Sequence, residues 1–255
     1  TPTKDILDFP AEALVRFFQN HALLDFEGQH QWYTVQGGSV EYVRRMQASL
    51  EGRGVDIRLG APVAAVKREA GSVFVRAHGG EWEVFDDVIF ATHSDVTLRL
   101  LADATPAEAR ALGAVKYQAN EAVLHRDPQV MPKNRKCWSS WVYVEPAAGA
   151  SGKIDLTYWM NSLQPIPQDD PIFVTLNSNG GIRDELVDDV VSFDHPVYDL
   201  AALQAQGEIR AMNGSLNTWF AGAWMKNGFH EDGFASALDV VEAMRSGARE
   251  RQMAA

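Results

Sequence analysis

The feature that most constrains the fold is the run Val88-Ile89-Phe90-Ala91, which is apolar at every position. A strand with two apolar faces is typical of the centre of a parallel sheet that helices cover on both sides. The sequence predicts a helix after it, ending near Ala102. A capping box, Thr105-Pro106-Ala107-Glu108, then starts a short helix that ends at Gly113. A second short buried strand, Thr218-Trp219-Phe220-Ala221-Gly222, is predicted far away in the sequence.

Other segments divide into helical and strand-like patterns. Apolar periodicity predicts helices at 10–24 and from Ser39 to about Leu50, the second with Val40, Val43, Met46 and Leu50 turned inward. Strands are predicted at 55–59 and 63–66, and a hairpin is predicted from 73–75 and 82–85. Strand-like pieces at 117–125, 137–144, 154–160 and 172–176 predict a second domain with a largely antiparallel sheet. A last helix is predicted from about Gly233 to Met244.

Composition excludes several classes of protein. The 255 residues are 46% hydrophobic, which is an ordinary globular composition. The charge is -11, with 34 acidic and 23 basic residues and no basic block, so nucleic acid is not an expected partner. No stretch approaches the roughly 20 apolar residues of a membrane-spanning helix. The single cysteine, Cys137, cannot form an internal disulfide, which fits a reducing cytoplasm, and we expect it to be a buried small side chain.

The usual hydrolytic and metal-binding patterns are missing from the sequence. The seven histidines include no His-x-x-x-His pair, and no second cysteine is present, so no metal site is predicted. No Gly-x-Ser-x-Gly turn is present either, which argues against a serine hydrolase of that type.

The segment with the strongest functional signal is C-terminal. A strand, Trp219-Phe220-Ala221-Gly222, is followed by a glycine-bearing loop, Asn227-Gly228-Phe229-His230-Glu231-Asp232-Gly233, and then by a helix. The amide groups at the start of a helix favour electron-rich or anionic ligand atoms. An ordinary strand-to-helix turn, in which Glu231 and Asp232 complement the helix dipole, explains the same residues and stays open.

Three segments, in order, resemble the FAD-dependent amine oxidase superfamily. They are Tyr33-Thr34-Val35-Gln36-Gly37-Gly38-Ser39, then Asp87-Val88-Ile89-Phe90-Ala91-Thr92, then Phe220-Ala221-Gly222 through Gly233. More narrowly, the chain resembles bacterial proteins described as predicted NAD/FAD-binding or flavin-containing amine oxidase-like proteins. The resemblance covers nearly the whole chain.

The resemblance implies an α/β fold of the α+β mixed kind. It has a partial Rossmann-like FAD-binding domain, residues 32–104 and 216–247, interleaved with a mixed or antiparallel-sheet substrate domain, residues 1–31 and 105–215. The family's Gly-x-Gly-x-x-Gly unit, which cradles a pyrophosphate, is not present. With the start at Thr1, this leads us to expect that about 150–200 preceding residues of a longer protein are absent. The acidic residue that many relatives carry after the Phe-Ala-Gly strand is replaced by Ala223 and Trp224.

The resemblance also implies which residues touch the cofactor. The backbone of Val66 would lie near the adenine, and Ala91 and Thr92 end a strand where open sheets place ligands. Gly222, Phe229, His230, Glu231, Asp232 and Gly233 would run past the flavin, with Phe229 as a wall of the substrate site. A histidine such as His230 can carry protons near neutral pH. Trp138, Trp141 and Tyr158 are expected either to line an apolar substrate pocket or to be core residues.

The implied function is flavin oxidoreduction, in which a hydride leaves a C–N or C–C bond of a small-molecule substrate for FAD. The sequence does not identify catalytic residues or the substrate. Two alternatives stay open: a non-catalytic fragment or binding module that does not hold FAD alone, and a desaturase or isomerase acting on lipid or carotenoid substrates.

Overall fold

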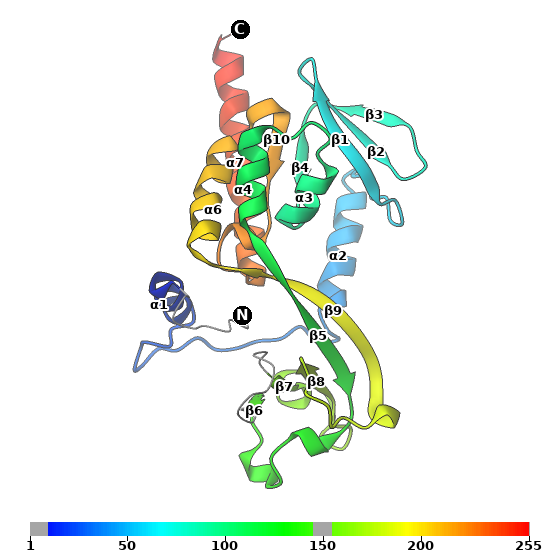
Figure 1. The fold of residues 1–255 in the computed structure, drawn as a ribbon, viewed down its shortest axis with the longest axis vertical. Coiled ribbons are helices and arrows are strands. Elements are labelled where there is room, and N and C mark those ends of the chain that lie inside the picture. The colour runs from blue at the N-terminus through cyan, green and yellow to red at the C-terminus, as the bar shows by residue number, and fades with distance from the viewer. Residues whose placement is uncertain (1–9, 145–154, 255) are drawn as a thin grey trace. The chain divides into compact units, whose positions relative to one another are not determined.

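The computed structural model describes residues 10–144 and 155–254. Helices and strands are mixed, as the sequence predicted (Figure 1). The chain divides into two compact units that are interleaved in sequence. Unit 1 contains residues 25–57 and 118–195 of the described chain, and unit 2 contains residues 10–24, 58–117 and 196–254. Which parts form a flavin domain stays a prediction, because packing alone does not identify a ligand.

Unit 2 is built around two parallel strands, β4 (Val88–Phe90) and β10 (Thr218–Phe220). Their register pairs Val88 with Thr218 and Phe90 with Phe220, and the two phenylalanine rings stack at 6.0 Å. Helices α3 (Ser94–Leu100), α4 (Pro106–Ala114), α6 (Leu200–Met212) and α7 (His230–Ala254) belong to the same unit. The core includes buried side chains from the strands, α4 and α6, among them Leu112, Ile209 and Phe220.

A three-stranded antiparallel meander completes unit 2. It consists of β1 (Val63–Glu69), β2 (Ser72–Ala77) and β3 (Trp82–Phe85), in that order. The predicted hairpin is therefore confirmed. Helix α1 (Ala11–Asn20) also belongs to unit 2 and is shorter than predicted. The predicted strand at 55–59 is wrong, because these residues form turns and irregular backbone.

A buried ion pair joins the meander to the rest of unit 2. Arg68 of β1 donates to both oxygens of Glu108 at 2.8 and 2.9 Å, and these side chains are only 3% and 6% exposed. Arg68 also pairs with Asp103 at 2.9 Å and donates to Thr218 Oγ1 of β10 at 3.2 Å. Burial alone would raise the pKa of Glu108, but the hydrogen bonds from Arg68 and Thr105 hold it below its ordinary value.

Glu108 also completes the predicted capping box. Its backbone amide donates to Thr105 Oγ1, and its carboxylate accepts from the Thr105 amide at 2.8 Å. One carboxylate thus caps α4 and neutralises Arg68, so the start of this helix is fixed to β1 and β10.

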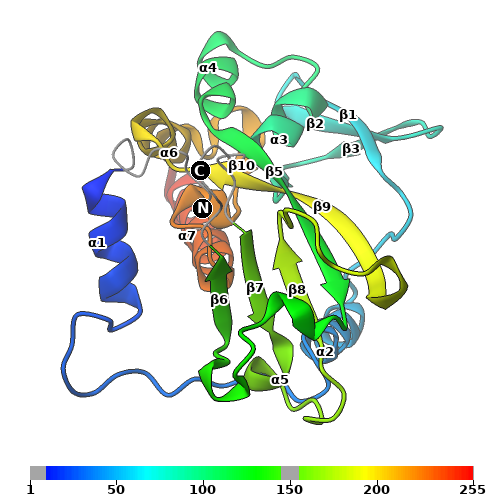
Figure 2. The same ribbon diagram turned by 60° about the horizontal axis from the view of Figure 1, so that its bottom comes forward.

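Unit 1 contains a five-stranded sheet in the order β6-β7-β8-β5-β9, visible in Figure 2. The strands are β5 (Lys116–His125), β6 (Trp141–Val144), β7 (Asp155–Trp159), β8 (Phe173–Leu176) and β9 (Val187–Val197). The pairs β6–β7, β7–β8 and β5–β8 are antiparallel, as predicted. Helix α2 (Val40–Glu51) and the short α5 (Met160–Leu163) belong to this unit.

Polar side chains fill part of the interior of unit 1. His125 is fully buried and lies 2.8 Å from Thr175 Oγ1, which lies 2.8 Å from Thr157 Oγ1. The carboxylate of Asp127 is also buried and accepts three hydrogen bonds from the amide and guanidinium of Arg183, each at 3.0 Å. These bonds lower the pKa of Asp127 to about 2.

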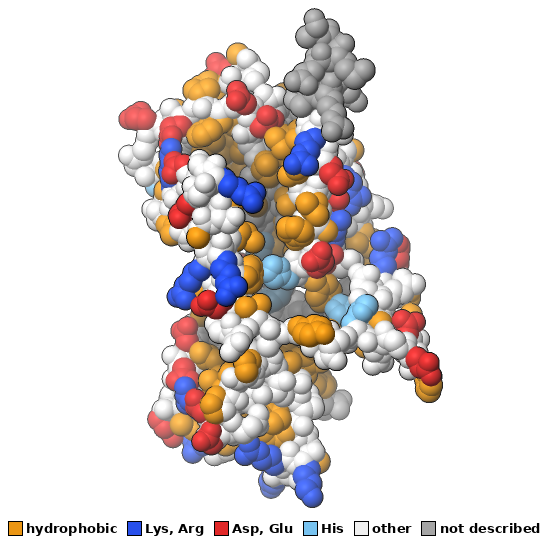
Figure 3. Space-filling view, turned by 180° about the vertical axis from the view of Figure 1, so that it is seen from behind, with side chains coloured by type: hydrophobic (Ala, Val, Ile, Leu, Met, Phe, Trp, Pro, Cys, Tyr) orange, Lys and Arg blue, Asp and Glu red, His pale blue; other side chains and the backbone are white. Residues whose placement is uncertain are grey.

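The orientation predicted for the second helix is not observed. Helix α2 forms where predicted, but its apolar residues are exposed in the structure: Val40 by 45%, Val43 by 49%, Met46 by 51% and Leu50 by 37%. The expectation that they point inward is therefore wrong for the described chain. Figure 3 shows hydrophobic side chains among the charged ones on the face that it displays.

We predict that Arg68→Met destabilises unit 2 by about 3–5 kcal/mol, because it leaves the buried Glu108 carboxylate without its partner. The matched control is Arg110→Met. Arg110 is 68% exposed and pairs with Glu208 at 3.1 Å, so this change should cost about 0–1 kcal/mol. Urea unfolding of both variants measures the difference, and equal losses would contradict a structural role for the buried pair.

Candidate functional site

Two strands of unit 2 end side by side. Because β4 and β10 are parallel, Ala91-Thr92 and Ala221-Gly222 follow them at the same edge, and the Ala221 amide donates to Phe90 O at 2.9 Å. Open sheets with parallel strands place ligands outside the carboxyl ends of their strands. The structure thus brings together two of the segments that the sequence predicted to contact a cofactor.

Trp224 covers part of this edge. Its indole Nε1 donates to Thr92 O at 3.0 Å, and the side chain is only 3% exposed. The tryptophan that stands near the place of the family's acidic residue therefore connects the end of β4 to the turn after β10. Its position indicates that this chain stabilises the edge by packing as well as by hydrogen bonding.

Gly222 is fixed by its surroundings. Its φ is +148°, and a Cβ built on it would lie 2.6 Å from Trp224 Nε1. Its amide donates to Ser236 Oγ at 2.8 Å, and Ser236 donates to Gly233 O at 2.7 Å. These contacts attach the turn after β10 to the first turns of α7, so the glycine is required by packing within the protein itself.

The loop before α7 is organised by Asp232. The carboxylate accepts a hydrogen bond from the Phe229 amide at 2.9 Å and one from Asn227 Nδ2 at 3.4 Å. The helix begins at His230, three residues earlier than predicted, and His230 and Glu231 are exposed. Asp232 therefore has a structural role in the described chain, as the alternative interpretation of this segment expected.

The Phe229 ring lies against aromatic side chains from α1 and from the residue that follows this helix. Its centroid is 5.8 Å from that of Phe17 and 4.9 Å from that of His21. Phe229 is 39% exposed, so one side of the ring remains open. The structure thus places it at the surface of an aromatic cluster in unit 2, a position suited to a wall of a binding site.

Tyr198 was missed by the sequence reasoning. Its side chain is 7% exposed, and its hydroxyl has no hydrogen-bond partner among the described residues. The hydroxyl lies against Gly228, where an added Cβ would be 2.5 Å from it. Burial raises the pKa of Tyr198, and the nearby Asp232 carboxylate raises it further. A neutral, unused donor is therefore held beside the loop that precedes α7.

Val66 lies in the core of the same unit. Its side chain is 1% exposed, and its carbonyl accepts a hydrogen bond from the Ala102 amide at 2.9 Å. Its contact with an adenine stays a prediction, and one lone pair of the carbonyl already has a partner.

The aromatic residues predicted to line a pocket lie on two faces of the unit 1 sheet. Trp141 and Tyr158 are cross-strand partners, with ring centroids 6.3 Å apart. Trp138 instead packs on Trp159 and Phe173, at 5.2 and 5.7 Å. Tyr158 and Trp159 are neighbours in one strand, so their side chains point to opposite faces. Trp138 packs on Trp159 and therefore lies on the face of the sheet opposite to Trp141 and Tyr158. Phe229 belongs to unit 2.

The structure also bears on the expectations about metal sites, membrane-spanning helices and Cys137. Among the residues that the structure describes, no cluster of three or more His, Cys, Asp or Glu side chains could hold a metal ion. Within the same part of the chain, none of the helices combines the length and apolarity that a membrane crossing requires. Cys137 is exposed, so the expectation that it is a buried side chain is wrong.

The chain belongs to the family of flavin-containing amine oxidoreductases. The profile of that family matches residues 6–152, more than half of the sequence. The flavin cofactor class predicted from the sequence is thereby confirmed at the level of the family. No curated protein matches this sequence significantly.

Two solved structures are similar to the chain. One is a CLA-producing fatty acid isomerase from P. acnes, with 14% identity and a TM-score of 0.48, covering 72% of this chain and 47% of that one. The other is a putrescine oxidase triple mutant with redesigned cofactor binding, with 16% identity and a TM-score of 0.49, covering 84% of this chain and 53% of that one. The chain thus spans about half the length of these proteins.

The residues around the loop that precedes α7 fit part of a flavin. Tyr198 supplies a buried donor without a partner, and α7 supplies the amides of its first turn. Both suit a ligand edge that carries acceptor atoms. The spaces beside Gly222 and Gly228 are filled by Trp224 and Tyr198, so neither glycine by itself provides an open cradle.

We predict opposite effects for two glycine-to-alanine changes. Gly222→Ala should destabilise the protein by about 2–3 kcal/mol, because its Cβ meets Trp224 and its φ of +148° disfavours a side chain. Gly233→Ala should be neutral or stabilising by up to about 1 kcal/mol, because its Cβ would be 3.6 Å from Ala223 N, within a helix. Thermal unfolding of both variants checks the signs, and a stable Gly222→Ala variant would contradict the packing described.

Proposed function

We propose that this chain is the C-terminal portion of an FAD-dependent oxidoreductase. The observation that supports this most is the shared edge of β4 and β10 beside the start of α7, in a chain of a flavin-containing family. The proposed activity is oxidation of a small molecule at a C–N or C–C bond. FAD, when bound, supplies the hydride acceptor for that reaction.

The residues proposed to hold the flavin are those at or near this edge. Tyr198 Oη would donate a hydrogen bond to it, and the first amides of α7 would favour acceptor atoms. Trp224 and Phe229 would exclude water from the reacting end. The full set combines these with the residues predicted from the sequence: Val66, Ala91, Thr92, Gly222, His230, Glu231, Asp232 and Gly233.

The proposed substrate surface is the face of the unit 1 sheet that carries Trp141 and Tyr158. The strand partners of these residues place Leu156, Val174 and Leu176 on the same face, all half-buried. A half-buried aromatic and aliphatic face suits the apolar part of a substrate. Trp138, on the other face, is assigned to the core.

The second candidate is a fragment or binding module that does not hold FAD alone. It is favoured by the lack of a Gly-x-Gly-x-x-Gly unit and by the two glycine positions whose space the chain's own side chains fill. The two candidates are compatible if a preceding unit, which we also propose, supplies the phosphate contacts. A cytoplasmic location fits both.

We predict that the 255-residue chain alone binds FAD weakly, and that fusing a strand–Gly-x-Gly-x-x-Gly–helix unit in front of it raises the affinity. In the fusion, Tyr198→Phe should weaken FAD binding about five- to tenfold, the value of one buried hydrogen bond. Tyr143→Phe is the control, because Tyr143 is 55% exposed on β6. Quenching of flavin fluorescence measures both.

Two results would contradict this prediction. Tight, stoichiometric FAD in the isolated chain would exclude an essential additional unit. Equal affinities in the two tyrosine variants would remove Tyr198 from the flavin site, while weak binding in the fusion itself would favour the second candidate.

We predict that alanine substitutions of Trp138 and Trp141 differ in their effects on stability and on ligand binding. Trp138→Ala should cost about 3 kcal/mol of stability, because it removes packing against Trp159 and Phe173. Trp141→Ala should cost about 1 kcal/mol or less, since Trp141 is 57% exposed, and should weaken apolar ligands selectively. Thermal melts beside binding of a hydrophobic fluorescent probe test this, and a collapsed melt in Trp141→Ala would assign that residue to the core.

A further inference from the structure

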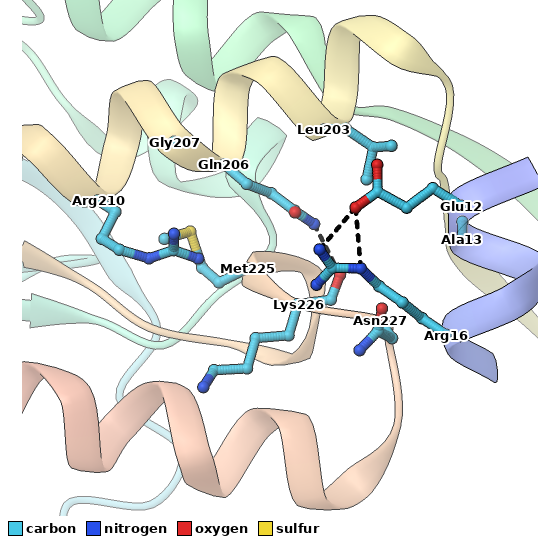
Figure 4. Close-up of a pocket in the computed structure, with 10 residues that line it drawn as sticks. All are labelled: Glu12, Ala13, Arg16, Leu203, Gln206, Gly207, Arg210, Met225, Lys226 and Asn227. Carbon is cyan, nitrogen blue, oxygen red and sulfur yellow. Dashed lines mark hydrogen bonds and ion pairs between the residues drawn. The ribbon is translucent and has the colours of Figure 1, made fainter. Parts of the chain in front are cut away.

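Unit 2 contains a pocket that does not include the residues at the ends of β4 and β10. A cavity of about 420 Å³ lies between α1, α6 and the loop at 225–227, and Figure 4 shows its lining. That volume is within the range of about 300–1,000 Å³ found for small-molecule sites. We call it the cationic pocket, after Arg16, Arg210 and Lys226.

The pocket is lined by more basic than acidic side chains, although the chain as a whole is acidic. Three cations, Arg16, Arg210 and Lys226, line it beside one carboxylate, Glu12, in a chain whose net charge is -11. Arg16 pairs with Glu12 at 2.6 Å, and Lys226 pairs with Asp239 of α7 at 3.0 Å. Within the described residues, the Arg210 guanidinium has no hydrogen-bond or ion-pair partner.

The walls of the pocket are held in place before any ligand is present. Gln206 of α6 donates to the carbonyls of Trp224 and Lys226, at 2.9 and 2.7 Å, which fixes the loop to this helix. Glu12 accepts from Nε and Nη2 of Arg16, at 3.1 and 2.6 Å, so the guanidinium is oriented from α1 toward α6 (Figure 4). Such preorganisation lowers the entropy lost on binding.

We propose that the cationic pocket binds the phosphate group of a small molecule, with Arg210 as the principal contact. A carboxylate has two oxygens and is satisfied by one guanidinium fork, whereas a phosphate offers three oxygens and up to two charges. Arg210 is the cation of the pocket without a partner among the described residues, and Arg16 and Lys226, each paired with one carboxylate, add further donors from two other segments. This inference does not rest on the proposed function, because it uses neither the strand edge nor the sheet face.

The test is calorimetric titration of the 255-residue chain with pyrophosphate at low ionic strength, and with acetate as the carboxylate comparison. We expect a pyrophosphate Kd below about 1 mM, weakened by added salt, and acetate at least about tenfold weaker. Arg210→Gln should weaken pyrophosphate about tenfold or more. Arg110→Gln removes the same charge from an exposed pair on α4, and should change the affinity less than about twofold.

Competition with FAD distinguishes two sources of the phosphate group, the FAD cofactor and a separate phosphorylated ligand. If FAD displaces pyrophosphate from the wild-type chain and Arg210→Gln weakens both, the phosphate belongs to the cofactor. If FAD does not displace pyrophosphate, the pocket serves a separate phosphorylated ligand. A pyrophosphate Kd above about 10 mM, equal binding of acetate, or equal losses in Arg210→Gln and Arg110→Gln would each overturn the proposal.

Discussion

The buried pair of Arg68 and Glu108 is the interaction on which unit 2 depends. It joins β1 to the first turn of α4, and through Thr218 it reaches β10. A guanidinium and a carboxylate are costly to remove from water unless they are well paired, and here Asp103 pairs with Arg68 and the capping box adds hydrogen bonds to Glu108. The position of β10, and with it the turn at Gly222, follows from this network.

From that anchored strand, the chain builds its candidate site by local packing. Gly222 turns against Trp224, Trp224 donates to the end of β4, and Ser236 connects the turn to α7. These contacts already occupy the Thr92 carbonyl and the Gly222 amide, two polar groups at the strand ends. The hydroxyl of Tyr198 is a buried group without a partner among the described residues, and it lies beside the loop that precedes α7, which is why it is central to the proposed function.

The sequence predicted those elements whose signals are local. The capping box at Thr105 and the hairpin of β2 and β3 formed as expected, because each depends on neighbouring residues. Strand β4 also formed, but Ile89 is 46% exposed and β4 pairs only with β10 in the described chain, so the expectation of a central strand covered on both faces is wrong. Strand β9 was not predicted, since Val187–Val197 is mostly exposed and interrupted by aspartates. The helix α6 was also not predicted.

The candidate site was predictable in outline only. Both β4 and β10 were predicted as strands, and the resemblance assigned both to the flavin domain, but their parallel pairing was not predicted. Sequence alone could not place Trp138 and Trp141 on opposite faces, since that depends on a bend before β6 and on strand register. Tyr198 carries no sequence signal, because its importance lies in the absence of a partner for its hydroxyl among the described residues.

The central claim is that the edge of β4 and β10, with the start of α7, contacts the flavin. Photolabelling of the fusion protein with 8-azido-FAD, followed by peptide mapping, tests this most directly, because the label attaches to residues beside the isoalloxazine ring. The account predicts labelling in residues 221–233 or at 91–92, reduced by an excess of unmodified FAD. Specific labelling confined to the sheet of unit 1, or none that FAD suppresses, would contradict it.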